Sequence, residues 1–194
     1  MCKTTKNKKF VVFLYIFFSY RHNSSKCDKK VVYKSTQERG INMDYEINTD
    51  TLAIIPIDDN TSKVYEEEAE YLINKSANSI IKENCEYYGS SYEGRCIGTK
   101  YLTGIKAKYP IIIEETRNII FFPTSSIRGK QTTWIALDKV KKYNKNHHYK
   151  NKTNICFNND KKIDINISYY SLDNQVCRAT ILKSKLYDRK IKEK

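Results

Sequence analysis

The chain has 194 residues, of which 40% are apolar, and it carries a net charge of +13. A chain of this length is expected to form a single domain, and its apolar content is high enough for a buried core. A chain too polar to fold is therefore excluded. The charge changes sign along the sequence: residues 1–42 carry +8, residues 43–93 carry −9, and residues 94–194 carry +14. Such a polarised field is typical of a protein that binds a polyanion, with nucleic acid as the first class of partner and an anionic membrane surface as the second.

Residues 1–42 differ in character from the rest of the chain. Lysines precede the apolar run Phe10–Phe18, which has the outline of a signal peptide, but no small-residue cleavage site follows. The run is also too short for a membrane span, which needs ~20 residues. Glu38-Arg39-Gly40 can be encoded by a purine-rich string of the kind that precedes a start codon, here that of Met43. We therefore predict that residues 1–42 are an N-terminal extension outside the native domain, with an export signal as the alternative.

The first part of the predicted domain contains two strands and an acidic run. Short β-branched runs at Thr51–Ile57 and Ser62–Tyr65 indicate the strands. The acidic run Glu66–Glu70 lacks the residue spacing of a calcium-binding loop. We therefore expect it to form a solvated acidic face.

A helix is predicted over residues 77–88. Ser76 stands at the position of an N-cap, and Gly89 stands where a glycine commonly ends a helix. Its apolar residues recur on one face, and these are Ile80, Ile81, Cys85 and Tyr88.

The stretch Gly89–Pro123 holds four of the six glycines and two of the three prolines. Two apolar runs within it, residues 111–113 and 119–122, are separated by a short polar link and predict a buried β-hairpin. The glycine-spaced segment before the hairpin is predicted to be a loop that binds a partner. Its basic residues are Arg95, Lys100, Lys106 and Lys108. A connector whose lysines only keep it solvated is the alternative.

The polar loop of residues 124–133 contains Arg128-Gly129-Lys130. A slim backbone beside basic side chains is the pattern of hooks that enter an AT-rich minor groove, although a basic surface turn is the more frequent setting of such a tripeptide. The next segment, Trp134–Tyr143, is predicted to be a short helix because Leu137 and Val140 are spaced by three. It carries Lys139, Lys141 and Lys142.

The C-terminal third predicts a second hairpin and a terminal helix. The hairpin consists of Asn154–Phe157 and Lys162–Ser168, in which isoleucines alternate with polar residues. Ser171 is expected to cap the terminal helix, whose apolar stripe consists of Leu172, Val176, Ala179 and Leu186.

No pattern in the chain points to catalysis or to a metal. The sequence has no nucleophile elbow, Walker loop or HExxH motif. His147 and His148 are adjacent and have no ligand at metal-binding spacing. The cysteines form no CxxC pair, and buried reduced thiols, among them Cys85 and Cys177, are the simplest expectation.

Several long motifs occur in the same order in a known family. They are GSSYEGR (residues 89–95), TKYLTGIKAKYPIII (99–113), IIFFPTSS (119–126), WI (134–135) and FNNDKKIDINISYYSLDNQVCRATILKSK (157–185). On these residues the chain resembles the ComK family of bacterial competence transcription factors, from about Tyr45 to Leu186. The resemblance implies a cytoplasmic activator of competence genes that binds paired AT-rich boxes, mainly through the minor groove, as dimers that pair on the promoter. It also implies RNA polymerase and an adaptor with a Clp protease as protein partners.

Three departures from the family pattern stand out. Tyr109-Pro110 replaces a Pro-Pro, and Arg128-Gly129-Lys130-Gln131 replaces an Arg-Pro-Gln-Cys. The chain ends at Lys194, before the tail that the family uses for activation and proteolytic control. The resemblance therefore implies DNA binding more directly than it implies these two roles.

The sequence thus predicts an α+β fold over residues 43–194, built of antiparallel β-hairpins with a central helix and a C-terminal helix. The predicted function is sequence-selective binding of double-stranded DNA, with no catalysis, cofactor, metal or small-molecule substrate. The alternative is a secreted or membrane-surface basic protein stabilised by disulfides. The residues predicted to contact DNA are Arg95, Lys100, Lys106, Lys108, Arg128, Lys130, Lys139, Lys141 and Lys142.

Overall fold

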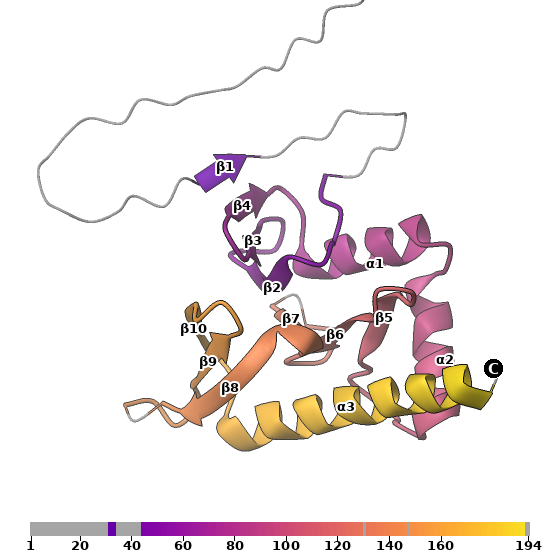
Figure 1. Cartoon of the computed structure of the whole chain (residues 1–194). Coiled ribbons are helices and arrows are strands. Elements are labelled where there is room, and N and C mark those ends of the chain that lie inside the picture. Colours follow the sequence, from indigo (N-terminus) through magenta and orange to yellow (C-terminus); the bar gives the residue numbers. More distant parts are fainter. Residues whose placement is uncertain (1–30, 34–43, 130, 147, 193–194) are drawn as a thin grey trace, which may run out of the picture.

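The structure is a computed structural model that describes residues 31–33, 44–129, 131–146 and 148–192 (Figure 1). Seven strands form one sheet in the order β1-β4-β3-β2-β7-β6-β5, and three form a second in the order β10-β9-β8. The strands of the large sheet are β1 (Val31–Tyr33), β2 (Thr51–Pro56), β3 (Ser62–Glu66), β4 (Glu70–Ile73), β5 (Ile111–Glu114), β6 (Ile119–Pro123) and β7 (Trp134–Ala136). Those of the small sheet are β8 (Val140–Lys145), β9 (Thr153–Phe157) and β10 (Lys162–Ile165).

Three helices complete the described part of the chain: α1 (Ala77–Tyr87), α2 (Tyr92–Thr103) and α3 (Tyr169–Lys192). The strand pairs are antiparallel except for β1 and β4, which run parallel. The predicted α+β class, with antiparallel hairpins and a C-terminal helix, is confirmed. Within residues 1–42 the structure describes only β1. The prediction that this segment lies outside the domain therefore stays a prediction.

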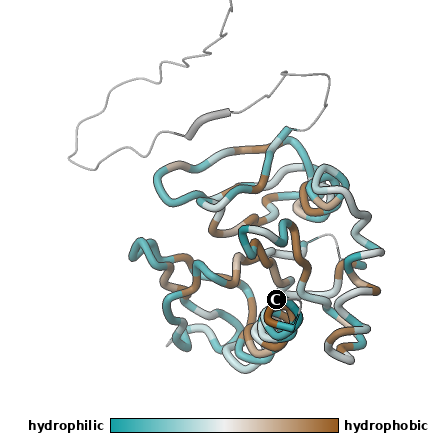
Figure 2. Tube along the Cα trace, turned by 45° about the vertical axis from the view of Figure 1, so that its right-hand side comes forward, coloured by the Kyte–Doolittle hydropathy of each residue, from teal (hydrophilic) through white to brown (hydrophobic). Residues whose placement is uncertain are grey.

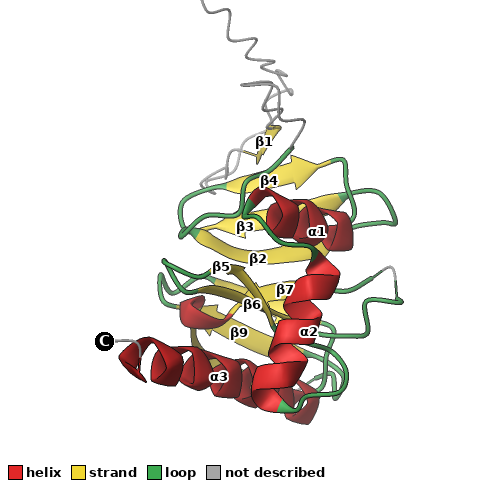
Figure 3. Ribbon diagram, turned by 90° about the vertical axis from the view of Figure 1, so that its right-hand side faces the viewer, coloured by secondary structure: helices red, strands yellow, loops and turns green. Residues whose placement is uncertain are grey.

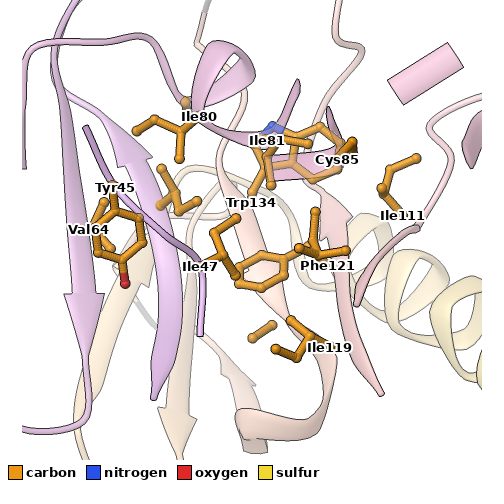
Figure 4. Close-up of a cluster of buried hydrophobic side chains, with 14 of the residues drawn as sticks. Tyr45, Ile47, Val64, Ile80, Ile81, Cys85, Ile111, Ile119, Phe121 and Trp134 are labelled. Atoms are coloured by element: carbon orange, nitrogen blue, oxygen red, sulfur yellow. The ribbon is translucent and has the colours of Figure 1, made fainter. Parts of the chain in front are cut away.

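Side chains alternate between the two faces of the large sheet, and strands β5, β6 and β7 are buried on both faces, apart from half-buried Glu114. In β5, Ile111 and Ile113 join one apolar cluster, and Ile112 joins the other. The first cluster lies beneath α1, where Trp134 and Phe121 are fully buried (Figure 4). The second lies between the large sheet, the small sheet and α3. Along the chain trace, apolar colour is concentrated in the central strands, and the loops are mostly polar (Figure 2).

Helix α1 forms as its sequence predicts. The Ser76 side chain accepts a hydrogen bond from the Ser79 N–H, and Gly89 follows the helix with a φ of 77°. The side chains of Ile80, Ile81 and Cys85 are buried against the sheet. The hairpin β5–β6 is likewise confirmed, and its two strands are almost entirely buried.

The predicted loop of residues 89–110 is largely a helix, α2, so that part of the prediction is wrong. The Ser91 side chain accepts a hydrogen bond from the Gly94 N–H and caps the first turn. Gly104 ends the helix in the left-handed conformation, with a φ of 72°. Buried Tyr92 and Thr99 hold the helix to the core, and this packing outweighs the low helix propensity of the glycines inside it.

Residues 134–143 are not a helix. They form β7, a single 3₁₀ turn over Leu137–Lys139, and the start of β8. The three-residue spacing of Leu137 and Val140 reflects that single turn and not a longer helix. The strands on either side form because they pair with other strands. Strand β7 pairs with β2 and β6, and β8 pairs with β9.

Three smaller expectations also need correction. Helix α3 begins at Tyr169, and its first turn is capped by Ser168, whose side chain accepts from the Ser171 N–H. Ser171 is therefore inside the helix. Within the acidic run, Glu66 and Glu70 are 9% and 7% exposed, so this run is not a solvated face. Cys177 is exposed, not buried.

Candidate nucleic-acid interface

Buried Gln175 joins three segments at one end of the molecule. Its amide nitrogen donates to the carbonyl of Lys108, at 3.3 Å, and to the carbonyl of Pro123, at 2.6 Å. Lys108 belongs to the α2–β5 loop, and Pro123 leads into the β6–β7 loop. The neighbouring Arg178 side chain donates to the carbonyl of Ala107. The two loops and the first half of α3 are therefore held side by side.

The tip of the hairpin β8–β9 lies at the start of the same helix. Tyr143 in β8 donates its hydroxyl hydrogen to Asp173, and Lys145 at the end of β8 lies 3.1 Å from the Tyr170 hydroxyl. In Figure 1 this hairpin projects beyond the N-terminus of α3. We call the exposed or half-buried basic side chains of these loops and of the tip of this hairpin, from Lys145 onward, the basic end. They are Lys106, Lys108, Arg128, Lys145, Lys150 and Lys152.

The β6–β7 loop holds Arg128 at the surface on an ordered backbone. The amide nitrogen of Asn78 in α1 donates to the carbonyls on either side of Arg128, those of Ile127 and Gly129, at 3.2 Å each. The Gly129 N–H donates to the Ser126 carbonyl at 2.8 Å, which closes a tight turn. Arg128 is exposed on this fixed turn and has no ion-pair partner among the described residues. Its guanidinium is therefore available to a ligand.

Lys106 and Lys108 occupy the α2–β5 loop, and both are exposed. Lys108 adopts a φ of 51°, a left-handed conformation that is uncommon for a long side chain. The hydrogen bond from Gln175 to its carbonyl stabilises that conformation. No carboxylate among the described residues pairs with either lysine.

A pocket of about 240 Å³ opens between the β8–β9 tip and the start of α3. Its lining consists of Lys145, Asn146, Lys150, Lys152, Ser168, Tyr169 and Tyr170. The Lys145 ammonium lies 4.7 Å from the centre of the Tyr170 ring, and Tyr170 is 71% exposed. Lysines beside exposed aromatic rings can hold a phosphate and stack on a sugar or base.

The loops and the hairpin tip that carry the basic end contain no acidic side chain, and the first acid of α3 is Asp173, which accepts the hydrogen bond from Tyr143. Residues 99–113, 119–137, 139–159 and 165–172 have no Asp or Glu. Some lysines elsewhere are paired with carboxylates. Lys139 lies 2.5 Å from Glu67, and Lys183 lies 2.5 Å from Asp138. The residues of the basic end have no such partner among the described residues.

The structure thus separates the nine residues predicted from the sequence. Lys106, Lys108 and Arg128 lie at the basic end, and Lys130 falls outside the described residues. Lys100 is exposed on α2, one turn before its end. Lys142 is exposed on β8.

The remaining three residues are held by groups of the protein itself. The Arg95 guanidinium, half-buried on α2, donates to the Tyr88 carbonyl at 3.3 Å. Lys139 pairs with Glu67, and Lys141 pairs with Asp160 at 2.8 Å. The hydrogen bond from Lys141 lowers the pKa of the Asp160 carboxyl and raises that of the lysine. These three residues are poorly placed to bind a ligand.

Sequence reasoning missed Lys145, Lys150 and Lys152, none of which is among the nine residues predicted to contact DNA. One feature of the sequence could have indicated these lysines. Tyr149 lies among these lysines, and Tyr169-Tyr170 follows in the motif at the start of α3. Alternation of lysine with tyrosine is typical of surfaces that bind nucleic acid.

Unpaired basic side chains beside exposed aromatic rings are typical of the class of proteins that bind a polyanion. The chain belongs to the ComK family: residues 42–191 match the family described as "ComK protein". It is 36% identical over 148 residues to a protein of Bacillus subtilis (strain 168) named "Competence transcription factor", and the match covers 75% of this chain and 76% of that protein. No solved structure matches the chain.

Two features of other classes of protein are absent from the described residues. No helix in that part of the chain is long and apolar enough to cross a membrane. No three His, Cys, Asp or Glu side chains there come together in a way that could hold a metal ion.

Proposed function

We propose that this protein is a transcriptional activator of competence genes that binds double-stranded DNA through its basic end. Membership of the ComK family and the similarity to a competence transcription factor support the activator role. In this proposal the protein acts in the cytoplasm, performs no catalysis, and has RNA polymerase and an adaptor–protease complex as protein partners. The native domain begins at Met43, a boundary that the family match over residues 42–191 supports.

The observation that carries DNA binding is the cluster of unpaired cations at the basic end. Its basic side chains project from loops and a hairpin tip that contain no acid. By contrast, Lys139, Lys141 and Lys183 are paired with carboxylates at 2.5 to 2.8 Å. Phosphates attract unpaired cations most strongly, since no internal ion pair must be broken to bind them. The basic end therefore faces the duplex.

Within this interface the two kinds of cation have different roles. Lysines such as Lys106 and Lys108 meet phosphates as point charges and position the protein. Arg128 stands beside Gly129 on a slim, fixed turn, so its side chain can enter a narrow minor groove. A-tracts have such a groove, with an enhanced negative potential that attracts arginine. We propose that this contact gives the preference for AT-rich boxes.

A gel-shift titration of the wild type on AT-rich and GC-rich duplexes tests this function. Tighter binding to the AT-rich duplex is expected. Raising salt from about 50 to 200 mM should weaken binding by about 10³ or more if six or more phosphates are neutralised. A minor-groove drug should compete with the protein, whereas a major-groove ligand should not. Equal affinity for both duplexes together with competition by the major-groove ligand alone would contradict the proposal.

A further inference from the structure

The two edges of the large sheet are built differently. At one edge, Pro110 precedes β5, the pairing of β5 with β6 has a register shift, and the Thr99 hydroxyl of α2 donates to the Pro110 carbonyl. Proline, irregular pairing and a covering helix are features that keep a sheet edge from accepting another strand. At the other edge, β4 contains neither proline nor lysine, and its pairing with β3 is regular. The edge formed by β4 can therefore accept a further strand.

The backbone groups of β4 alternate between its two sides. The Glu66 N–H donates to the Ala69 carbonyl at 2.9 Å and closes the turn between β3 and β4. In an antiparallel ladder every second residue is directed to the partner strand, so Tyr71 is directed to β3 like Ala69. Glu70 and Leu72 therefore direct their N–H and C=O groups to the outer side of β4.

Strand β1 indicates which kind of strand fits this side. It pairs with β4 in parallel, with Val32 opposite Tyr71, and in Figure 3 it lies beyond β4 at the end of the sheet. In a parallel ladder a residue lies between the two residues that flank its partner, so the backbone of Val32 lies between those of Glu70 and Leu72. The sequence of β1, Val-Val-Tyr, is a β-branched and aromatic run of the kind that favours a strand.

The charges beside this edge favour a strand that lysines precede. In the parallel direction, residues before the paired run lie toward the β3–β4 turn, which contains Glu67 and Glu68. Glu68 is exposed and forms no ion pair with a described residue. In the sequence, Lys29 and Lys30 come directly before Val31. A peptide with this sequence, bound in the same register, would therefore bring positive charge close to an unpaired carboxylate.

We propose that the outer edge of β4 is a docking site for an extended segment of a protein partner, which adds to the large sheet as a parallel strand. The segment has the chemistry of residues 29–33, two lysines followed by a β-branched and aromatic run. Backbone hydrogen bonds supply its affinity, and the charge of Glu68 favours the lysines. Strand β4 is at the opposite edge of the sheet from β5, to which the α2–β5 loop of the basic end leads. The inference therefore does not depend on DNA binding.

In the full chain, β1 competes with the partner for this edge. A segment of the same chain has a high effective concentration, so a separate peptide displaces it poorly. A chain that begins at Met43 has no β1, and its β4 edge is left to the partner. The proposed start of the native domain and the docking site are thus compatible.

A peptide-binding experiment on the full chain tests the docking site. Val32→Pro removes the N–H that β1 directs to β4, so this variant should free the edge. The probe is a fluorescein-labelled peptide of residues 29–37 (KKVVYKSTQ). Fluorescence anisotropy should show that the probe binds the Val32→Pro chain at least tenfold more tightly than the wild-type chain. The same peptide with the Val32→Pro change is the control and should bind neither chain.

Three outcomes of this experiment would overturn the proposal. The first is equal binding of the probe to the two chains, and the second is no binding to the Val32→Pro chain. The third is a lower midpoint of thermal unfolding for that chain, because β1 would then belong to the stable fold and the edge would not be open to a partner. The proposal predicts an unchanged midpoint.

Hydrogen exchange locates the bound peptide. The Leu72 N–H is directed to the outer side of β4, so it should exchange at least tenfold faster in the Val32→Pro chain than in the wild type. Addition of the peptide should restore its protection. The Tyr71 N–H, directed to β3, is the internal control and should exchange slowly in every sample. If Leu72 exchanges at the same rate in the two chains, or the peptide protects other amides instead, β4 is not the site.

A charge reversal tests the preference for lysines. In the Val32→Pro chain, Glu68→Lys should weaken binding of the peptide about threefold, and added salt should reduce the difference. Glu93→Lys makes the same change of charge at an exposed position of α2, which packs against β5 at the other edge of the sheet. This matched control should leave peptide binding unchanged. Equal losses in the two variants would show that the peptide responds only to net charge, and would contradict the proposed register.

Discussion

The side chain of Asn78 couples the core to the exposed turn that carries Arg128. Its carbonyl oxygen accepts a hydrogen bond from the indole N–H of Trp134 at 2.9 Å. Its amide nitrogen donates to the carbonyls of Ile127 and Gly129. One amide thus satisfies the indole of the central tryptophan and holds the turn in place.

Asn78→Ala should therefore have two effects. Loss of the acceptor for Trp134 should lower the free energy of unfolding by about 1–3 kcal/mol. Release of the turn should also reduce the preference for AT-rich over GC-rich duplex, since Arg128 would no longer be held in place. Denaturant unfolding and a gel shift measure the two effects. Asn74→Ala, at an exposed position just before α1, is the control and should change neither.

Arg128 and Lys108 should differ in what they contribute to binding. Arg128→Ala should reduce affinity for the AT-rich duplex more than for the GC-rich duplex. Lys108→Ala should weaken both about equally and make the salt dependence shallower by about one unit of slope. Lys141→Ala should change little, because this lysine is paired with Asp160. An equal loss on both duplexes for Arg128→Ala would show that this residue contacts phosphate only.

The thiols should react in an order set by their burial. Cys177 is exposed and should be alkylated rapidly at pH 8, whereas buried Cys85 and Cys156 should react only on unfolding. Burial raises the pKa of the Cys85 thiol to about 12. The unfolded thiol ionises nearer pH 9, so its ionisation should favour unfolding as the pH rises above that value. Mass spectrometry after timed alkylation gives the order. If Cys177 is alkylated only after a reductant is added, it forms a disulfide. That result would support the secreted, disulfide-bonded alternative.

Removal of residues 1–42 should leave folding and DNA binding intact, because β1, the described strand of this segment, lies at the edge of the sheet and pairs only with β4. The charge and composition of the chain change at Met43, and the family match covers residues 42–191. Thermal unfolding and gel shifts of a chain that begins at Met43 provide the test, with the full chain as reference. Loss of folding in the shorter chain would contradict the proposed boundary.

The elements predicted correctly from the sequence are those whose determinants are local. The hairpin β5–β6 has two apolar runs joined by a short link, and α1 has its cap residue Ser76 beside its apolar face. Helix α2 was missed because Gly94 and Gly98 weaken helix propensity. Its stability comes instead from caps and from contacts such as the Thr99 hydroxyl donating to the Pro110 carbonyl.

The candidate interface was predicted less well because charge pairing depends on contacts between distant residues. Lys139 and its partner Glu67 are 72 positions apart, so the sequence alone could not show that this lysine is neutralised. For the same reason, it could not show that Gln175 brings two loops together with the start of α3. The local tripeptide that contains Arg128 could be recognised, since its context is a single turn.

The most direct measurement compares DNA binding by two variants with the same loss of charge. One removes the pocket lysines of the basic end (Lys145→Gln, Lys150→Gln, Lys152→Gln), and the other removes paired cations elsewhere (Lys141→Gln, Lys183→Gln, Arg189→Gln). If the basic end binds the duplex, the first variant should bind the AT-rich duplex far more weakly, with a salt slope shallower by about 2 to 3 units. The second should bind almost like the wild type. Equal losses in the two variants would show that only net charge matters, and would contradict a defined DNA-binding end.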